Sequence, residues 1–258
     1  MTPDSYTTSE MMTVAAARRL RDGAVCFVGI GLPSTAANLA RLSHAPRAVL
    51  IYESGTIGAK PSVLPLSIGD GELATSADTV VSTPEVFRYY LQGGRIDVGF
   101  LGAAQIDRFA NINTTVIGSY RKPKTRLPGA GGAPEIAALA GEVLIIMPQS
   151  ARSFVKQLDF VTSVGFLDGG DARERAGLPG NGPVAVITDL CIFEPDPVTR
   201  ELTVVSIHPG VERATLEAAT GWPVRYFSRL STTDLPNTHE LSTLRDLIQR
   251  TATAHGPD

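Results

Sequence analysis

Residues 25–34 read VCFVGIGLPS, and residues 48–55 read AVLIYESG. Each stretch begins with a short apolar run, which is typical of a strand buried on both faces of a sheet. The first run leads through Gly29-Ile30-Gly31 into a helical stretch from Ser34 to about Leu42. A strand, a helix and a second strand at 48–52 in close succession form a βαβ unit, so we expect the two strands to pair in parallel.

The rest of the chain continues this alternation of helices and strands. Capping-box patterns, Thr7 with Glu10 and Asn237 with Glu240, predict a first helix over 8–22 and a C-terminal helix. The C-terminal helix should bury one stripe, formed by Leu241, Leu244, Leu247 and Ile248. Further strands are predicted at 98–101, 143–147, 184–187 and 202–207, and further helices near 84–92 and 211–220. We therefore expect one domain over residues 1–258, of the α/β class, with an open, mostly parallel sheet covered by helices.

Composition excludes several classes of protein. The 258 residues carry a net charge of −3, and 43% of them are hydrophobic. This balance argues against a disordered chain and against a nucleic-acid binder. Glycine, proline and polar residues interrupt the longest uncharged stretch, so a membrane span is not expected. Cys26 and Cys191 lie in apolar runs and the four histidines lack ligand spacing, so we expect buried thiols, no disulfide, no metal and a cytoplasmic protein.

Two features follow the predicted strands of the βαβ unit. Glu53 comes directly after the second strand, and Gly55 permits a sharp turn that would lift the carboxylate into a crevice at the sheet edge. The alternative is that Glu53 caps the next turn. Gly29 and Gly31 precede a helix, where backbone amides attract anions, or they form only a tight connection. A dinucleotide fingerprint with Glu53 on the ribose is disfavoured because Ser34 replaces its third glycine.

Polar and glycine-rich segments in the middle of the chain offer further candidates. Gln105, Asn111 and Asn113 could orient a small polar substrate or simply hydrogen-bond within a loop. The turn 129–134 contains Gly131 and Gly132, whose amides could stabilise a developing oxyanion. Four cations lie just before it and would suit a phosphate-bearing ligand, an acidic partner or a solvated loop: Arg121, Lys122, Lys124 and Arg126.

Taken together, these segments resemble the β subunits of class I CoA-transferases, in the branch that acts on glutaconate and 3-oxoadipate. The similarity runs along most of the chain in matching order and spacing, with Glu-Ser-Gly where many members have Glu-Asn-Gly. It rests on Gly29-Ile30-Gly31-Leu32-Pro33, Tyr52-Glu53-Ser54-Gly55-Thr56-Ile57-Gly58-Ala59, Gly102-Ala103-Ala104-Gln105, Asn111-Ile112-Asn113, Gly129-Ala130-Gly131-Gly132, His208-Pro209-Gly210-Val211 and Thr220-Gly221-Trp222-Pro223.

The resemblance implies a fold like that of ribose-phosphate isomerase and a function in CoA transfer. It implies that Glu53 is the nucleophile, which attacks succinyl-CoA to form an acyl-glutamyl anhydride and then an enzyme-CoA thioester, from which CoA passes to 3-oxoadipate. Amides at Gly29, Gly31, Gly131 and Gly132 would bind the oxyanion or CoA. Substrate would be oriented by Ser54, Gln105, Asn111 and Asn113, and CoA phosphates or the partner subunit would contact Arg121, Lys122, Lys124 and Arg126.

The resemblance also implies an α subunit, in a heterodimer or an α2β2 complex, with CoA as a substrate and no tightly bound cofactor. Glutaconate or another dicarboxylate as acceptor remains an alternative, as does acyl-CoA hydrolysis. A ligand sensor is disfavoured because no DNA-binding module is seen. Ala110 stands where relatives often have glycine, and alanine resists positive φ, so the conformation of this loop is left open.

Overall fold

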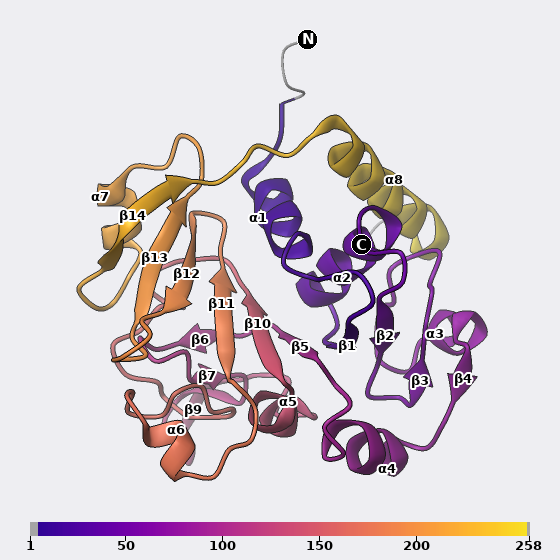
Figure 1. The fold of residues 1–258 in the computed structure, drawn as a ribbon, viewed down its shortest axis with the longest axis horizontal. Helices are drawn as coiled ribbons and strands as arrows, with labels where there is room; N and C mark the ends of the chain where they lie inside the picture. The colour runs from indigo at the N-terminus through magenta and orange to yellow at the C-terminus, as the bar shows by residue number, and fades with distance from the viewer. Residues whose placement is uncertain (1–4, 257–258) are drawn as a thin grey trace. The chain divides into compact units, whose positions relative to one another are not determined.

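The computed structural model describes residues 5–256, which divide into two compact units (Figure 1). Unit 1 contains residues 5–100 together with 235–256, and unit 2 contains residues 101–234. Each unit has its own strands and its own helices, and each is described here by itself. The α/β class predicted from the sequence is confirmed, while the prediction of one domain over the whole chain stays a prediction.

The strands of unit 1 lie in the order β5-β1-β2-β3-β4. The predicted βαβ unit is confirmed, because β1 pairs in parallel with β2, and β1 also pairs in parallel with β5. The two remaining pairs, β2–β3 and β3–β4, are antiparallel and were not predicted. The strands are β1 (Val25–Val28), β2 (Val49–Ile51), β3 (Thr56–Ile57), β4 (Thr79–Val80) and β5 (Val98–Leu101).

The helices of unit 1 include α1, α2 and α8, which contact one another. Both predicted capping boxes are present, and two ion pairs join α1 to α8: Arg18 with Glu240 at 2.7 Å and Arg245 with Glu10 at 2.6 Å. The helices are α1 (Thr8–Ala17), α2 (Leu32–Leu42), α3 (Gly71–Ser76), α4 (Thr83–Glu85), the π-helix η1 (Val86–Leu91) and α8 (Thr238–His255).

Three sequence predictions for these helices need correction. Helix α1 ends at Ala17 rather than at residue 22, because Arg19 and Leu20 donate to carbonyls three residues back and tighten the chain beyond the α-helical geometry. Helix α2 begins at Leu32 rather than Ser34, since proline is tolerated in the first turn of a helix. Ile248 is 47% exposed, whereas the three leucines of its predicted stripe are buried.

The strands of unit 2 lie in the order β14-β13-β12-β11-β10 and mix both pairings (Figure 1). The pairs β10–β11 and β13–β14 are parallel, and β11–β12 and β12–β13 are antiparallel. The strands are β10 (Glu142–Ile146), β11 (Pro183–Ile187), β12 (Cys191–Pro195), β13 (Leu202–Ile207) and β14 (Arg225–Thr232). Strands β12 and β14 were missed by the sequence analysis; β14 is mostly exposed and lacks an apolar run.

Two small ribbons and three helices complete unit 2. Phe154 lies at the centre of its core, where its ring stacks on Phe193 at 5.6 Å and on Trp222 at 5.7 Å between centroids. The elements are β6 (Gln105–Ile106) paired with β7 (Ile112–Asn113), β8 (Val116–Gly118) paired with β9 (Pro123–Arg126), α5 (Ala133–Leu139), α6 (Ala172–Arg175) and α7 (Arg213–Ala218). Both cysteines are buried and free, as predicted, and no helix within residues 5–256 has the length and apolarity to cross a membrane.

His208 is a buried part of the unit 2 framework. Its Nε2 lies 2.8 Å from the carbonyl oxygen of Thr188, so Nε2 must donate, and its Nδ1 lies 2.9 Å from the hydroxyl of Thr233. The side chain is 3% exposed. Burial lowers the pKa of His208 below its ordinary value, although the Thr188 carbonyl and the charge of Asp189 act in the opposite direction. The neutral ring is therefore the form that the folded chain holds.

This burial predicts a loss of stability in mild acid. Because the folded state binds the His208 proton more weakly than the unfolded state, its contribution is complete above a pH of about 6.5 and is lost as the pH falls below that value. Urea unfolding between pH 8 and pH 5 should show a steeper decline for the wild type than for His208→Gln. His239→Gln, at an exposed histidine, is the matched control. Equal slopes for wild type and His208→Gln would contradict the prediction.

Candidate functional site

Glu53 lies at the tip of a tight turn between β2 and β3 in unit 1. The amide of Gly55 donates to the carbonyl of Tyr52 at 3.0 Å, and the amide of Tyr52 donates to the carbonyl of Thr56 at 3.1 Å. These two hydrogen bonds place Glu53 and Ser54 at the two central positions of the turn. Glu53 is half-buried there. The turn that the sequence predicted after this strand is thus present, with the carboxylate at its apex.

Gly55 is the residue that this turn requires. Its φ is 97°, in the region that favours glycine, and a Cβ at this position would lie 1.9 Å from the carbonyl oxygen of Val81. The backbones of the two residues are also joined, because the amide of Val81 donates to the carbonyl of Gly55 at 3.0 Å. The turn that carries Glu53 is therefore pinned against the segment that follows β4.

Tyr52 anchors the same turn to helix α2. Its hydroxyl lies 3.0 Å from the hydroxyl of Ser34 and accepts from the side-chain amide of Asn38 at 3.1 Å. Tyr52 and Asn38 are fully buried, and burial raises the pKa of the Tyr52 phenol. Arg41 in turn donates to the carbonyl of Pro61 at 2.9 Å and contacts the Asn38 side-chain oxygen at 3.3 Å. A buried polar network thus fixes the residue directly before Glu53.

Two hydroxyl groups beside Glu53 have unused hydrogen-bonding capacity. The side-chain oxygens of Ser54 and Thr56 are buried and make no hydrogen bond within residues 5–256. Thr56 is 2% exposed. Buried hydroxyls are normally satisfied, so both groups are available to a ligand that enters this part of unit 1. Ser54 was predicted from the sequence, whereas Thr56 was missed.

Gly29 and Gly31 lie at the same edge of the unit 1 strands as the Glu53 turn. They follow the carboxyl end of β1, which is parallel to β2, so the two loops leave neighbouring strands on one side. Gly29 donates to the carbonyl of Phe100 at 2.9 Å, and Gly31, with φ 84°, is the N-cap of α2. Since no side chain caps this helix, its N-terminal end presents a positive dipole without a side-chain acceptor.

Gln105 and Asn113 face each other across the β6–β7 ribbon of unit 2. The Asn113 amide donates to the Gln105 side-chain oxygen at 2.8 Å and to the carbonyl of Val116 at 2.7 Å, and the Gln105 amide donates to Asp159 at 2.9 Å. The Asn113 side-chain oxygen accepts from two backbone amides that follow it in the chain. Both side chains are buried and hold the fold of unit 2, and their predicted role toward substrate stays a prediction.

Asn111 closes a second buried network in unit 2. Its amide donates to Asp107 and to the carbonyl of Leu167, each at 2.9 Å, and its oxygen accepts from Gly165 at 2.8 Å and from Leu167 at 3.1 Å. All four hydrogen-bonding positions of the side-chain amide are occupied. Burial raises the pKa of the Asp107 carboxyl, while the hydrogen bonds that it accepts act in the opposite direction. A substrate-orienting role for Asn111 stays a prediction.

Ala110 adopts the left-handed conformation that the sequence left open. Its φ is 58°, although left-handed geometry costs an alanine about 1–2 kcal/mol. Asp107 offsets this cost, because its carboxylate accepts from the backbone amides of Phe109 at 2.9 Å and Asn111 at 3.0 Å. The loop thus keeps the glycine-like geometry without the glycine.

Gly131 and Gly132 precede α5 in unit 2, and Gly132 is its N-cap. Their loop is tied to the end of β7, since Thr114 donates through its hydroxyl to the carbonyl of Gly129 at 2.8 Å and its carbonyl accepts the Gly129 amide at 3.0 Å. The structure therefore brings this loop, Gln105 and Asn113 into one part of unit 2. Glu53, Ser54, Gly29 and Gly31 belong to unit 1.

The four predicted cations lie on the β8–β9 hairpin, away from these networks. Arg121 and Lys122 are in its turn, and Lys124 and Arg126 are in β9. All four are exposed. Their contacts to CoA phosphates stay a prediction.

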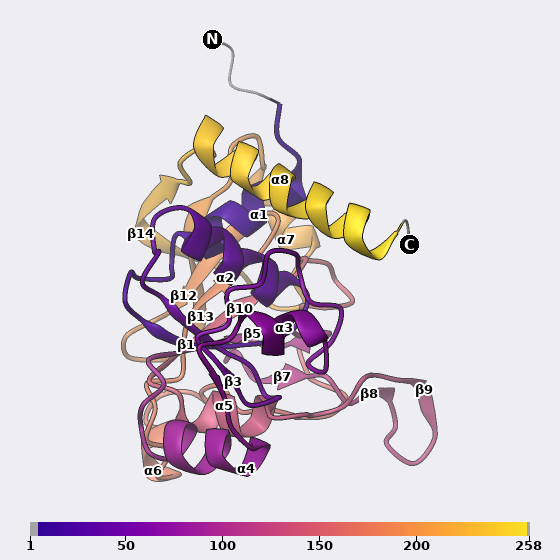
Figure 2. The ribbon, with the colours of Figure 1, turned by 90° about the vertical axis from the view of Figure 1, so that its right-hand side faces the viewer.

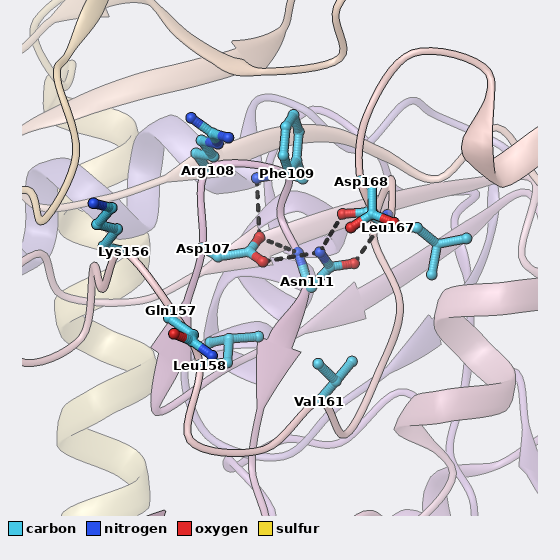
Figure 3. A pocket seen from close by; sticks show the side chains of 10 residues that line it. All are labelled: Asp107, Arg108, Phe109, Asn111, Lys156, Gln157, Leu158, Val161, Leu167 and Asp168. Carbon is cyan, nitrogen blue, oxygen red and sulfur yellow. Dashed lines mark hydrogen bonds between the residues drawn. The ribbon is translucent and has the colours of Figure 1, made fainter.

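A cavity of about 430 Å³ in unit 2 includes one predicted residue, Asn111 (Figure 3). Asp107 and Asn111 form hydrogen-bonded neighbours in its wall, and the cationic side chains of Arg108 and Lys156 also line it. The remaining lining residues are Phe109, Gln157, Leu158, Val161, Leu167 and Asp168. Within residues 5–256, no group of three histidine, cysteine, aspartate or glutamate side chains could hold a metal ion.

Sequence reasoning missed the residues that support the site. Ser34 and Asn38 lie four residues apart on α2, so their polar side chains share one helix face. Two polar residues on a face that should be buried were a signal for a partner such as Tyr52. Asp107 lies two residues before Phe109, whose amide it accepts, a spacing typical of a side chain that closes its own loop.

Known proteins similar to this chain were found by sequence and by structure. Residues 9–216 match the family model described as Coenzyme A transferase. The chain is 68% identical to the β subunit of 3-oxoadipate CoA-transferase from Pseudomonas knackmussii over 252 residues, which cover 98% of this chain and 97% of that protein. It is 37% identical to the β subunit of glutaconate CoA-transferase from Acidaminococcus fermentans, over 80% of this chain and 79% of that protein.

The crystal structure of glutaconate coenzyme A-transferase from Acidaminococcus fermentans is similar with a TM-score of 0.89. The match covers 99% of this chain and 100% of that one, at 32% sequence identity. The family resemblance drawn from the sequence is confirmed. The chain belongs to the coenzyme A transferase family.

Proposed function

We propose that this chain is the β subunit of a CoA-transferase that moves CoA from succinyl-CoA to 3-oxoadipate, with Glu53 as the nucleophile. The observation that carries the proposal is the placement of Glu53 at the apex of a turn fixed on both sides, by Tyr52 and by Gly55. The 68% identity to the matching subunit of a 3-oxoadipate CoA-transferase supports the choice of acceptor. A fixed carboxylate beside unsatisfied hydroxyls and a helix N-terminus suits attack on a thioester carbonyl.

The reaction divides into two halves around the Glu53 carboxylate. The carboxylate attacks the thioester carbonyl of succinyl-CoA, and the bond to sulfur breaks, giving an acyl-glutamyl anhydride and the CoA thiolate. The thiolate then attacks the glutamyl carbonyl and expels succinate, which leaves CoA bound to Glu53 as a thioester. The acceptor carboxylate attacks this thioester, and the CoA thiolate released attacks the acceptor's carbonyl, which regenerates Glu53.

Negative charge develops on a carbonyl oxygen in each of these steps. In unit 1, the backbone amides around Gly29 and Gly31 and the hydroxyls of Ser54 and Thr56 are the donors that could meet this charge. A preorganised donor of this kind lowers the barrier by roughly 3 kcal/mol. Amides near Gly131 and Gly132 are proposed to assist in the same way. An anhydride hydrolyses readily, so the reacting atoms must be kept from water.

An α subunit is proposed as the obligatory partner, because the similar proteins are themselves named as single subunits of their enzymes. The complex would be a heterodimer or an α2β2 assembly. CoA acts as a substrate in this scheme rather than as a resident cofactor. Cytoplasmic localisation is proposed because both cysteines are buried and free rather than joined in a disulfide.

Replacement of the nucleophile tests the reaction. Glu53→Gln keeps the size of the side chain but cannot form the anhydride, so kcat of the reconstituted complex should fall by about 10,000-fold or more. Glu174→Gln, at an exposed glutamate of unit 2, should retain wild-type activity. Mass spectrometry after succinyl-CoA and borohydride should find a reduced Glu53 in the wild type. Undiminished turnover by Glu53→Gln would exclude Glu53 as the nucleophile.

Paired assays test the acceptor and the reaction class. We expect 3-oxoadipate to be preferred over glutaconate, and equal turnover of the two acids would contradict the proposed acceptor. Glutaconate is the relevant competitor because a subunit of a glutaconate CoA-transferase is 37% identical to this chain. Release of free CoA without an acceptor, at the rate of transfer, would indicate a hydrolase instead.

Removal of one hydroxyl tests whether Tyr52 positions Glu53. Tyr52→Phe keeps the buried ring but leaves Ser34 and Asn38 without their partner, which should cost about 1–2 kcal/mol of stability. The Glu53 turn would lose its anchor to α2, so kcat should fall about 10- to 100-fold with little change in KM. Tyr89→Phe, at a tyrosine that is 59% exposed, is the control. A stability loss with unchanged kcat would show that Tyr52 has no positioning role.

A further inference from the structure

The β8–β9 hairpin extends away from the rest of unit 2 (Figure 2). Its strands pair over only a few residues, from Val116 opposite Arg126 to Gly118 opposite Pro123. Every residue from Ser119 to Arg126 except Pro123 is exposed. A short two-stranded ribbon is marginally stable in water, so something must hold this one in shape.

An aromatic and cationic stack stiffens the hairpin. The ring of Tyr120 stacks on Phe160 with centroids 5.5 Å apart and an angle of 23° between the planes. The guanidinium of Arg126 lies 4.7 Å from the Tyr120 centroid and donates to the Tyr120 carbonyl at 2.9 Å. Tyr120 nevertheless remains 55% exposed, and Val161, next to Phe160, is 51% exposed. The base of the hairpin thus presents ordered apolar surface.

The charge of the hairpin is uncompensated by its own segment. No acidic residue occurs between Asp107 and Glu135, and this stretch contains five basic ones. No ion pair is formed by Arg121, Lys122 or Lys124 with the described residues 5–256. The chain as a whole is acidic, with a net charge of −3. Three unpaired cations beside an ordered tyrosine and arginine form the composition that protein interfaces favour.

We propose that the β8–β9 hairpin is a docking arm that binds an acidic surface of the α subunit. This inference rests on the proposed function for the existence of that partner. In the complex, Tyr120 and Val161 would supply the buried apolar contact, and Lys122 and Lys124 would pair with carboxylates on the partner. The stack on Tyr120 holds the arm in one conformation before binding, so little ordering entropy is lost on association.

The same cations could instead contact CoA phosphates, which would make them part of the substrate site. The stack argues for the partner protein, because Phe160 and Arg126 already contact the Tyr120 ring and restrict its use as a platform for the adenine base. The two roles differ in what they control. A docking arm sets the affinity between subunits, whereas a phosphate site sets the KM for the acyl-CoA.

Charge reversal on the arm tests the inference in the full-length chain with its α subunit. Lys122→Glu with Lys124→Glu should raise the Kd of the complex about tenfold or more and flatten its dependence on salt. Tyr120→Ala should raise the Kd at every salt concentration. The matched control is Arg152→Glu with Arg175→Glu, which makes the same change of charge at other sites of unit 2. Its Kd should stay within about twofold of wild type.

Two results would overturn the inference. Unchanged Kd and salt dependence in the Lys122/Lys124 variant would show a solvated hairpin, and a raised KM for succinyl-CoA with normal assembly would assign the cations to CoA. The variants should keep the thermal midpoint of the isolated chain within about 2 °C. Failure of the proposed function is distinguishable: a wild-type complex whose assembly depends on the hairpin but that transfers no CoA to 3-oxoadipate would refute the activity and leave the docking arm supported.

Discussion

The contact between Gly55 and Val81 is the constraint on which the Glu53 turn depends. The backbone of Val81 occupies the space that any side chain at position 55 would need. This close approach leaves only one path for the chain between β2 and β3, and it places Glu53 at the apex. A carboxylate held in this way loses little further freedom when a thioester binds, which is the main advantage that a folded chain gives to a nucleophile of ordinary reactivity.

Buried polar networks perform a similar task in both units. In unit 1, the Tyr52 hydroxyl connects the turn to Ser34 and Asn38 on α2. In unit 2, Asn111 uses its whole side-chain amide to join two loops, and Asp107 holds Ala110 in a conformation that alanine avoids. Because an unsatisfied buried polar group costs about 1–3 kcal/mol, each network fixes one arrangement of its loop. The networks specify geometry more than they add stability.

The two units illustrate how one class of side chain serves different purposes. Cations of unit 1 such as Arg18 and Arg245 are consumed in ion pairs between α1 and α8. On the β8–β9 hairpin, by contrast, the lysines have no acidic neighbours in their own segment. Exposed unpaired charge contributes little to folding, so its concentration on a stiffened arm is more readily explained by association with another surface.

The sequence by itself determined the βαβ unit, both capping boxes and the position of Glu53 after a strand, since these depend on local periodicity and on neighbours within a few residues. It also carried the family resemblance. Only the tertiary structure decided that Gly55 meets Val81, that Tyr52 meets Asn38, and that Asn111 binds Gly165, because these partners are brought together by chain folding rather than by spacing. The exposed strand β14 was missed for the same reason: its pairing with β13, rather than its own hydrophobic pattern, makes it a strand.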